Sequence, residues 1–204
     1  MGHPLMENIK PYLGIIAVCL GLLAYIIYIS GILSNKTKPH AFSWLLWTLT
    51  TAVVFIAQTD KGAGAGSWST GFTCIVCLAI GIISIFKYDK AYTITDILFI
   101  GIALLALLPW FFTKNPTTSV VLIASIDVIG YGPTLRKSYY YPHEEKAISF
   151  GLNSVKHLLS LLALQNYMVA TWIYPASQIF MNGLVLAIVL IRKRQLAKKE
   201  NVIE

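Results

Sequence analysis

Residues 11–33 read PYLGIIAVCLGLLAYIIYISGIL and contain no charged side chain. A helix needs about 20 mostly apolar residues to cross the hydrocarbon core of a bilayer, so this stretch is long enough to span one. It is too long, and too weakly flanked by positive charge, for a cleaved signal peptide. We therefore expect a membrane-spanning helix here.

Further apolar segments follow this one and give seven predicted spans. In chain order the segments are 11–33, 39–58, 66–88, 93–112, 117–136, 146–165 and 168–191. Of the 204 residues, 56% are hydrophobic and 12% are charged, whereas a soluble domain carries about 25% charged residues. The sequence therefore predicts an all-α integral membrane protein of seven transmembrane helices, a single transmembrane domain without a separate soluble one.

Lysine and arginine residues fall unevenly on the two sides of the predicted bundle. One side carries only Lys10, Lys61 and Lys114. The other side carries Lys36, Lys38, Lys87, Lys90, Arg136, Lys137, Lys146, Arg192, Lys193, Arg194, Lys198 and Lys199. Because positive loops stay in the cytoplasm, we expect the N-terminus outside the cell and the basic tail, residues 192–204, in the cytoplasm. The expected location of the protein is a bacterial inner membrane. Orientation and contact with anionic lipid account for the net charge of +7, so nucleic acid is not an expected partner.

The chain also repeats itself weakly. An offset of 103 positions places Tyr28, Pro39 and His40 on Tyr131, Pro142 and His143, and an offset of 104 places Trp68 on Trp172. This spacing predicts two three-helix units, residues 11–88 and 117–191, joined by a linker helix at 93–112. A single linker helix gives both units the same orientation, so the predicted 3+1+3 repeat is parallel.

Residues 130–137, GYGPTLRK, place the pair Pro133-Thr134 near the cytoplasmic end of the fifth segment. With its 3+1+3 order and outside N-terminus, the chain resembles the SWEET and PQ-loop superfamily of small transporters and receptors, whose units carry a Pro-Gln-like pair there. The first unit departs from this pattern with Ser30-Gly31, and neither unit has the glutamine. Residues 38–44 and 62–68 are also similar to a group of bacterial membrane proteins, which implies no particular activity.

Two ionisable residues lie near the midpoints of predicted spans, Asp127 in the fifth and Lys156 in the sixth. Charged groups at membrane depth are costly and usually face the bundle interior, so each is a candidate functional residue. Their similar depth predicts an ion pair. The pair either holds two helices together permanently, or opens or changes protonation during transport. The desolvation cost of a buried pair favours the second interpretation, since apolar contacts would hold helices more cheaply.

The sixth segment carries a polar stripe. Asn153, Lys156, His157 and Ser160 stand at positions i, i+3, i+4 and i+7, which share one face of a helix. Lipid cannot satisfy the hydrogen bonds of such groups. The stripe therefore either lines a wet cavity or pairs with another polar stripe.

The seventh segment offers such a partner in Tyr174, Gln178 and Asn182. Hydrogen bonds between helices are the alternative role for these residues. In the SWEET family the third helix of each unit gives the substrate pocket a polar residue, often asparagine, so the resemblance assigns Gln178 or Asn182 to solute contact. The third segment has no matching asparagine, so a sugar is not implied. On the second segment Trp44 and Trp47 are candidates for an aromatic pocket wall. Trp47 is the deeper of the two, and for Trp44 an anchor at the membrane interface is the preferred alternative.

These features predict a transporter that moves a small polar solute by alternating access through a midplane site between the units. Asp127, Lys156 and His157 would supply charge or proton coupling, and Pro133 a hinge. A non-transporting receptor or sorting protein on the same bundle is the alternative. No nucleophile and base, metal-ligand cluster or cofactor motif is visible, so we expect no enzyme activity, cofactor or metal. The oligomeric state stays open, a homo-oligomer included.

Overall fold

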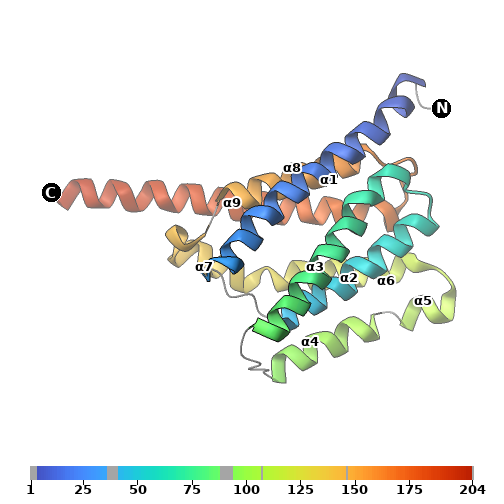
Figure 1. Cartoon of the computed structure of the whole chain (residues 1–204), viewed down its shortest axis with the longest axis horizontal. Coiled ribbons are helices and arrows are strands. Elements are labelled where there is room, and N and C mark those ends of the chain that lie inside the picture. Colours follow the sequence, from blue (N-terminus) through green and yellow to red (C-terminus); the bar gives the residue numbers. More distant parts are fainter. Residues whose placement is uncertain (1–3, 36–40, 88–93, 107, 146, 204) are drawn as a thin grey trace.

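The computed structural model describes residues 4–35, 41–87, 94–106, 108–145 and 147–203. In this part of the chain every regular element is helical. The elements are α1 (Pro4–Leu33), α2 (Ala41–Asp60), η1 (Gly64–Ser67), α3 (Trp68–Lys87), α4 (Ile94–Leu105), α5 (Leu108–Thr113), α6 (Pro116–Gly130), α7 (Gly132–Tyr140), η2 (Pro142–Glu144), α8 (Ala147–Leu162) and α9 (Val169–Ile203). Figure 1 shows the longer helices side by side, with the two termini at opposite ends of the bundle. We call these ends the N-terminal end and the C-terminal end.

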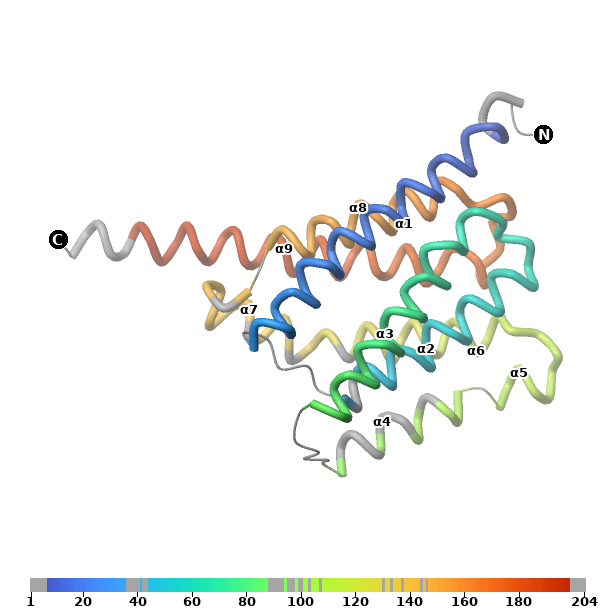
Figure 2. The backbone as a smooth tube through the Cα atoms, viewed as in Figure 1, coloured from blue at the N-terminus to red at the C-terminus, as the bar shows by residue number. Residues whose placement is uncertain are grey.

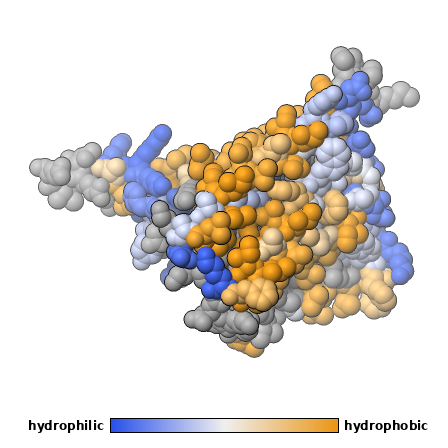
Figure 3. All heavy atoms as spheres, in the orientation of Figure 1, coloured by the Kyte–Doolittle hydropathy of each residue, from blue (hydrophilic) through white to orange (hydrophobic). Residues whose placement is uncertain are grey.

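Four helices are long and apolar enough to cross a membrane. They cover Glu7–Leu33, Gly64–Lys87, Pro116–Tyr140 and Val169–Lys198. Figure 3 shows a broad hydrophobic surface over the middle of the bundle, with hydrophilic residues toward both ends. Soluble monomers rarely expose an apolar surface of this extent. The all-helical prediction is confirmed for the described residues, and the four apolar helices indicate a membrane protein.

The fourth predicted segment was expected to form one helix over residues 93–112, and this is wrong. The chain forms α4 and then the short α5, and Ala106 lies in a turn between them. Pro109 has no N–H group to donate to the carbonyl of Leu105. A continuous helix would therefore lose a hydrogen bond at this point, and the chain breaks there instead.

The fifth predicted segment, 117–136, is also interrupted. The Asn115 side chain caps the start of α6 by accepting a hydrogen bond from the Thr117 N–H at 3.0 Å. The helix ends at Gly130, Tyr131 forms a turn, and α7 then continues to Tyr140. The break lies two residues before the predicted hinge Pro133, whose side chain lies outside the described residues. Movement at this break stays a prediction.

The last helix continues well beyond the predicted end of the seventh segment. α9 has 35 residues, about 52 Å at 1.5 Å per residue, compared with about 30 Å for the hydrocarbon core of a bilayer. Figure 2 shows it extending past the rest of the bundle at the C-terminal end. Two contacts hold it as it leaves: Arg192 Nε donates to the Tyr139 carbonyl at 3.0 Å, and Lys193 Nζ to the Glu145 carbonyl at 3.2 Å. Most of the predicted basic tail is therefore helix, which its lysine, arginine and glutamine residues favour.

Helix packing does not follow chain order. α3 contacts both α1 and α2, and α9 contacts both α6 and α8. α1 also contacts α8, and α2 also contacts α6 and α9. α4 lies against α2 at the edge of the bundle, as Figure 1 shows. The two halves of the chain therefore meet through helices α1, α2, α6, α8 and α9.

Candidate functional site

A cavity of about 530 Å³ lies between the helices of the two halves. It is lined by Ala24, Tyr25, Ile27, Tyr28, Trp44, Trp47, Thr51, Thr73, Cys77, Asp127, Tyr131, Thr134, Glu145, Ser149, Phe150, Asn153, Lys156, His157, Tyr174, Gln178 and Asn182. The predicted solute and coupling residues all belong to this lining, namely Trp47, Asp127, Asn153, Lys156, His157, Tyr174, Gln178 and Asn182. The structure thus brings together residues from four predicted spans around one space. Their role in binding stays a prediction.

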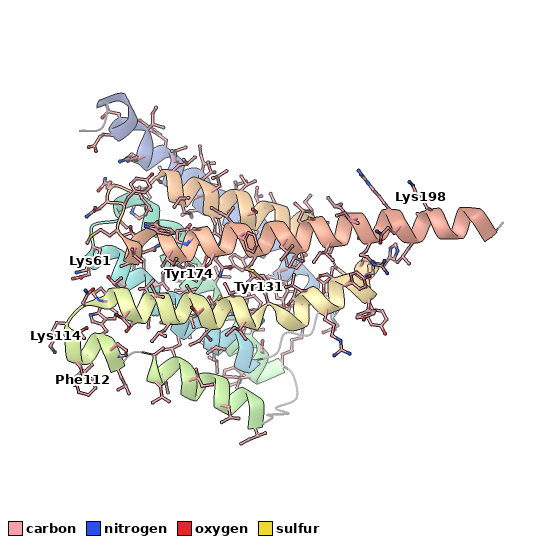
Figure 4. All side chains as sticks on the ribbon, turned by 180° about the vertical axis from the view of Figure 1, so that it is seen from behind. Lys61, Phe112, Lys114, Tyr131, Tyr174 and Lys198 are labelled. Atoms are coloured by element: carbon pink, nitrogen blue, oxygen red, sulfur yellow. The ribbon has the colours of Figure 1, made fainter. Side chains whose placement is uncertain are left out.

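A hydrogen-bonded network joins α9 to the break between α6 and α7. The Tyr131 hydroxyl donates to Gln178 Oε1 at 2.8 Å and accepts from Asn182 Nδ2 at 2.9 Å. Asn182 Nδ2 also donates to the Gln178 carbonyl one turn earlier, at 2.8 Å. Figure 4 shows Tyr131 and Tyr174 in the middle of the molecule. The network fixes the amide groups of Gln178 and Asn182 at the cavity wall.

Lys156 is almost completely buried, with 1% of its surface exposed. Its Nζ donates to Thr73 Oγ1 at 3.2 Å and lies 5.6 Å from the centre of the Tyr25 ring. Gly21 on α1 leaves room for this side chain, because a Cβ atom there would lie 3.1 Å from Lys156 Cδ. The lysine is therefore held against α1 and α3.

Asp127 lies on a different wall of the cavity. It is 8% exposed, and its carboxylate has no hydrogen bond or ion pair among the described residues. In particular, no pair within 4.0 Å joins it to Lys156, so the predicted ion pair is not formed. The prediction assumed that helices consecutive in sequence are neighbours. Instead α6 packs on α2 and α9, whereas the Lys156 side chain points toward α1 and α3.

His157 stands beside Lys156 and is 4% exposed. Its ring meets the Tyr174 ring edge-on, with the centroids 6.0 Å apart. Its Nδ1 is buried without a hydrogen-bond partner in the described part of the chain. A neutral imidazole has one donor and one acceptor nitrogen, so this ring retains unused hydrogen-bonding capacity.

Aromatic rings cover much of the remaining wall. The rings of Trp44 and Trp47 pack edge to face with their centroids 5.1 Å apart, and the centroid of the Tyr28 ring lies 5.0 Å from that of Trp44. Trp44 was expected to anchor at the membrane interface, but it is 7% exposed and lines the cavity. Trp47, the predicted pocket residue, lines the cavity too and is 44% exposed. The rings of Tyr28 and Trp47 flank Trp44 and cover it, so Trp44 is more buried than Trp47.

Sequence reasoning missed several polar residues at the cavity, among them Tyr25, Thr73 and Tyr131. Tyr131 carried a usable signal, because it aligns with Tyr28 in the repeat and both line the cavity. Tyr25 and Thr73 carry no charge and lie in predominantly apolar segments. Only the position of the Lys156 side chain reveals them.

The N-terminal end of the bundle is closed by contacts between the two halves. The Gln165 N–H donates to the Ala63 carbonyl at 3.0 Å, and Asn166 Nδ2 donates to the Lys61 carbonyl at 3.0 Å. These bonds join the connection between α2 and α3 to the connection between α8 and α9. We call the contacts of residues 61–69 with residues 160–166 the N-terminal seal.

Close helix approach completes the N-terminal seal. A Cβ atom on Gly66 would lie 2.8 Å from the Ser160 carbonyl oxygen and 2.5 Å from Leu164 Cδ2, so only glycine fits there. One turn deeper, the hydroxyls of Ser69 and Ser160 share a hydrogen bond. Gly66 thus allows close packing between the connection before α3 and helix α8.

The cavity lies on the other side of this closure. Its lining runs from Thr73 and Tyr174 near the middle of the bundle to Glu145, in the connection before α8. The space therefore extends toward the C-terminal end. Within the described residues, no group of three or more His, Cys, Asp or Glu side chains gathers to hold a metal ion. No family model, curated protein or solved structure matches this chain.

Proposed function

We propose that this protein carries a small polar solute across a membrane by alternating access, with the cavity as the solute site. The observation that carries the proposal is a cavity lined by buried polar groups, extending toward one end and sealed at the other. Buried polar groups without partners are costly, and a bound polar solute would satisfy them. A carrier also needs a site that faces one side at a time, and the N-terminal seal fits that need.

The packing supports a parallel 3+1+3 repeat. The first unit would be α1, α2 and α3, the linker α4 with α5, and the second unit α6 with α7, α8 and α9. In each unit the third helix contacts the other two, and the first helix contacts the second helix of the other unit. Cavity positions also match at the offset of 103, as the pairs Ala24 and Asp127, Tyr28 and Tyr131, and Trp47 and Phe150. Rearrangement of one unit against the other would then change the side to which the cavity opens.

Charge distribution supports an outside N-terminus. Figure 4 places Lys61 and Lys114 at the N-terminal end and Lys198 beyond the C-terminal end. Arg192 and Lys193 also lie where α9 leaves the bundle. Under the positive-inside rule, the cavity extends toward the cytoplasm in this conformation, in a bacterial inner membrane. The proposal places the chain with the SWEET and PQ-loop kind of small transporter.

Uptake by proteoliposomes tests the proposal. Vesicles with purified protein are incubated with a defined mixture of polar metabolites, and their contents are measured by mass spectrometry. We expect at least one metabolite to accumulate above protein-free vesicles. Gln178→Ala should reduce that uptake about tenfold, since it removes the acceptor for Tyr131. Ser125→Ala, an exposed α6 residue bonded only to the Val121 carbonyl in the described chain, serves as control. No uptake of any metabolite would overturn the proposal.

A receptor or sorting protein is the second candidate, favoured by the extension of α9. This part of α9 carries Lys198 beyond the bundle, as Figure 4 shows, where a cytoplasmic partner would have access to it. Truncation after Gln195 keeps the contacts of Arg192 and Lys193 with the bundle. A transporter should retain its uptake after this truncation. Loss of uptake by a truncated protein whose stability is unchanged would favour the receptor.

A further inference from the structure

We propose that the solute is a zwitterion with an apolar or aromatic body, whose cationic group faces Asp127 and whose anionic group faces Lys156. The inference rests on the cavity being the solute site of the proposed function. It starts from two buried residues of opposite charge that line one space without pairing.

Asp127 supplies the site for a cationic group. Its carboxylate is about nine-tenths buried, lines the cavity and has no partner in the described part of the chain. The aromatic rings of Tyr131, one turn further along the same face, and of Tyr174 on α9 line the same space. Carboxylates and aromatic faces both attract ammonium groups. An amine, rather than water alone, therefore suits this wall.

Lys156 supplies the site for an anionic group. Its Nζ has three donors, and Thr73 accepts from one of them. The Tyr25 ring lies near the ammonium group but offers no hydrogen-bond acceptor of carboxylate strength. His157, next in the chain and facing the same cavity, adds a second nitrogen-bearing side chain. A carboxylate bound here would accept the remaining donors of Lys156.

The two charged walls select against solutes that carry only one charge. A simple cation would satisfy Asp127 and leave Lys156 without an anion, and a simple anion would do the reverse. Each case leaves a buried charge uncompensated, which weakens binding strongly. A zwitterion satisfies both residues at once. The rings of Trp44, Trp47 and Phe150 on the remaining wall suit an apolar or aromatic body between the two ends.

A matched ligand series tests the charge requirement. L-Phenylalanine, 2-phenylethylamine and 3-phenylpropanoate share one body and carry both charges, only the cation or only the anion. The readout is the thermal unfolding midpoint of the purified protein, measured at increasing concentrations of each compound. We expect L-phenylalanine to raise the midpoint at roughly tenfold or more lower concentration than either analogue. Equal effects of the zwitterion and the amine, or of the zwitterion and the acid, would overturn the inference.

The variant Asp127→Asn tests whether the cationic group of the solute binds at Asp127. The variant should weaken the responses to L-phenylalanine and 2-phenylethylamine and leave the response to 3-phenylpropanoate unchanged. Glu7→Gln, which changes an exposed carboxylate on the first turn of α1 to an amide, is the matched control. Unaltered responses in Asp127→Asn, with the fold intact, would contradict the assignment.

Vesicle uptake separates this inference from the proposed function. Accumulation of an uncharged metabolite, without any response to L-phenylalanine, would retain transport and overturn the zwitterion. If L-phenylalanine selectively raises the unfolding midpoint but no solute accumulates in vesicles, the zwitterion site is supported and the transport function is overturned.

Discussion

Lys156 and Asp127 bring opposite charges into one cavity without meeting, and this has a cost for the empty protein. A buried charge without a counter-charge loses hydration that Thr73 or an aromatic ring replaces only in part. Apolar residues of similar size often stabilise a fold when they replace such charges. The two residues are therefore expected to lower stability, which a site for a charged solute explains.

Lys156→Met tests this directly. Methionine fills a similar volume and removes the charge, so the empty protein should become more stable, by on the order of 1 kcal/mol or more. The same variant should lose its response to L-phenylalanine. Thermal unfolding with and without this compound measures both effects, and Lys114→Met, at an exposed position just after α5, is the control. A marked fall in the midpoint would identify Lys156 as a structural residue.

Tyr131→Phe tests the network at the cavity wall. It removes the hydroxyl that donates to Gln178 and accepts from Asn182. Because hydrogen bonds between membrane helices contribute only about 0.6 kcal/mol each, stability should change little. Solute uptake should fall several-fold, since both amides lose their fixed orientation. Tyr140→Phe, at an exposed position at the end of α7, should show neither effect, and normal uptake by Tyr131→Phe would contradict the role of the network.

At the level of whole elements, Gly66 lies where the backbones of the two halves approach closely. Gly66→Ala would bring a Cβ atom too close to the Ser160 carbonyl, and backbone atoms cannot move aside as a side-chain end can. We expect a loss of about 1–3 kcal/mol of stability, as for overpacked sites in general. Gly101→Ala in α4 has no atom within 4 Å of the new Cβ and should be neutral or slightly stabilising. The difference between their unfolding midpoints measures the effect, and equal midpoints would argue against a tight seal.

Sequence predicts the helices better than their ends and their neighbours. Apolar length located the helical regions, and four of the resulting helices are long and apolar enough to cross a membrane. It missed the breaks near Ala106 and Tyr131, which lie three residues before Pro109 and two before Pro133. It also ended α9 too early, because hydropathy cannot distinguish a polar helix from an irregular tail. The candidate cavity residues stood out in the sequence because charged and amide side chains are uncommon within its apolar segments. The ion pair predicted between Asp127 and Lys156 is not formed, because α8 packs on α1 and α9 rather than beside α6.

For the molecule as a whole, the cavity and the N-terminal seal predict a difference in access between the two faces. In a background with Cys19, Cys74 and Cys77 changed to alanine, Ser149→Cys at the cavity should react with a membrane-impermeant maleimide added at the C-terminal face. Ser69→Cys, fully buried in the seal, should resist the reagent from either face. Gel-shift labelling of oriented vesicles measures both. Reaction of Ser149→Cys only from the N-terminal face would reverse the orientation of the cavity.

The single helix α9 connects the cavity to the aqueous phase without interruption. Pro175 lies beside Tyr174 at the cavity, and Lys198 lies on the same helix roughly 35 Å away at 1.5 Å per residue. A tilt of about 10° at the proline would displace the far end by roughly 6 Å over that length. A small tilt at Pro175 is thus amplified into a larger displacement at the C-terminal end of α9. Under the proposed transport function, a spectroscopic probe placed on Lys198 is expected to report movement of α9 at the cavity from a position far from the proposed solute site.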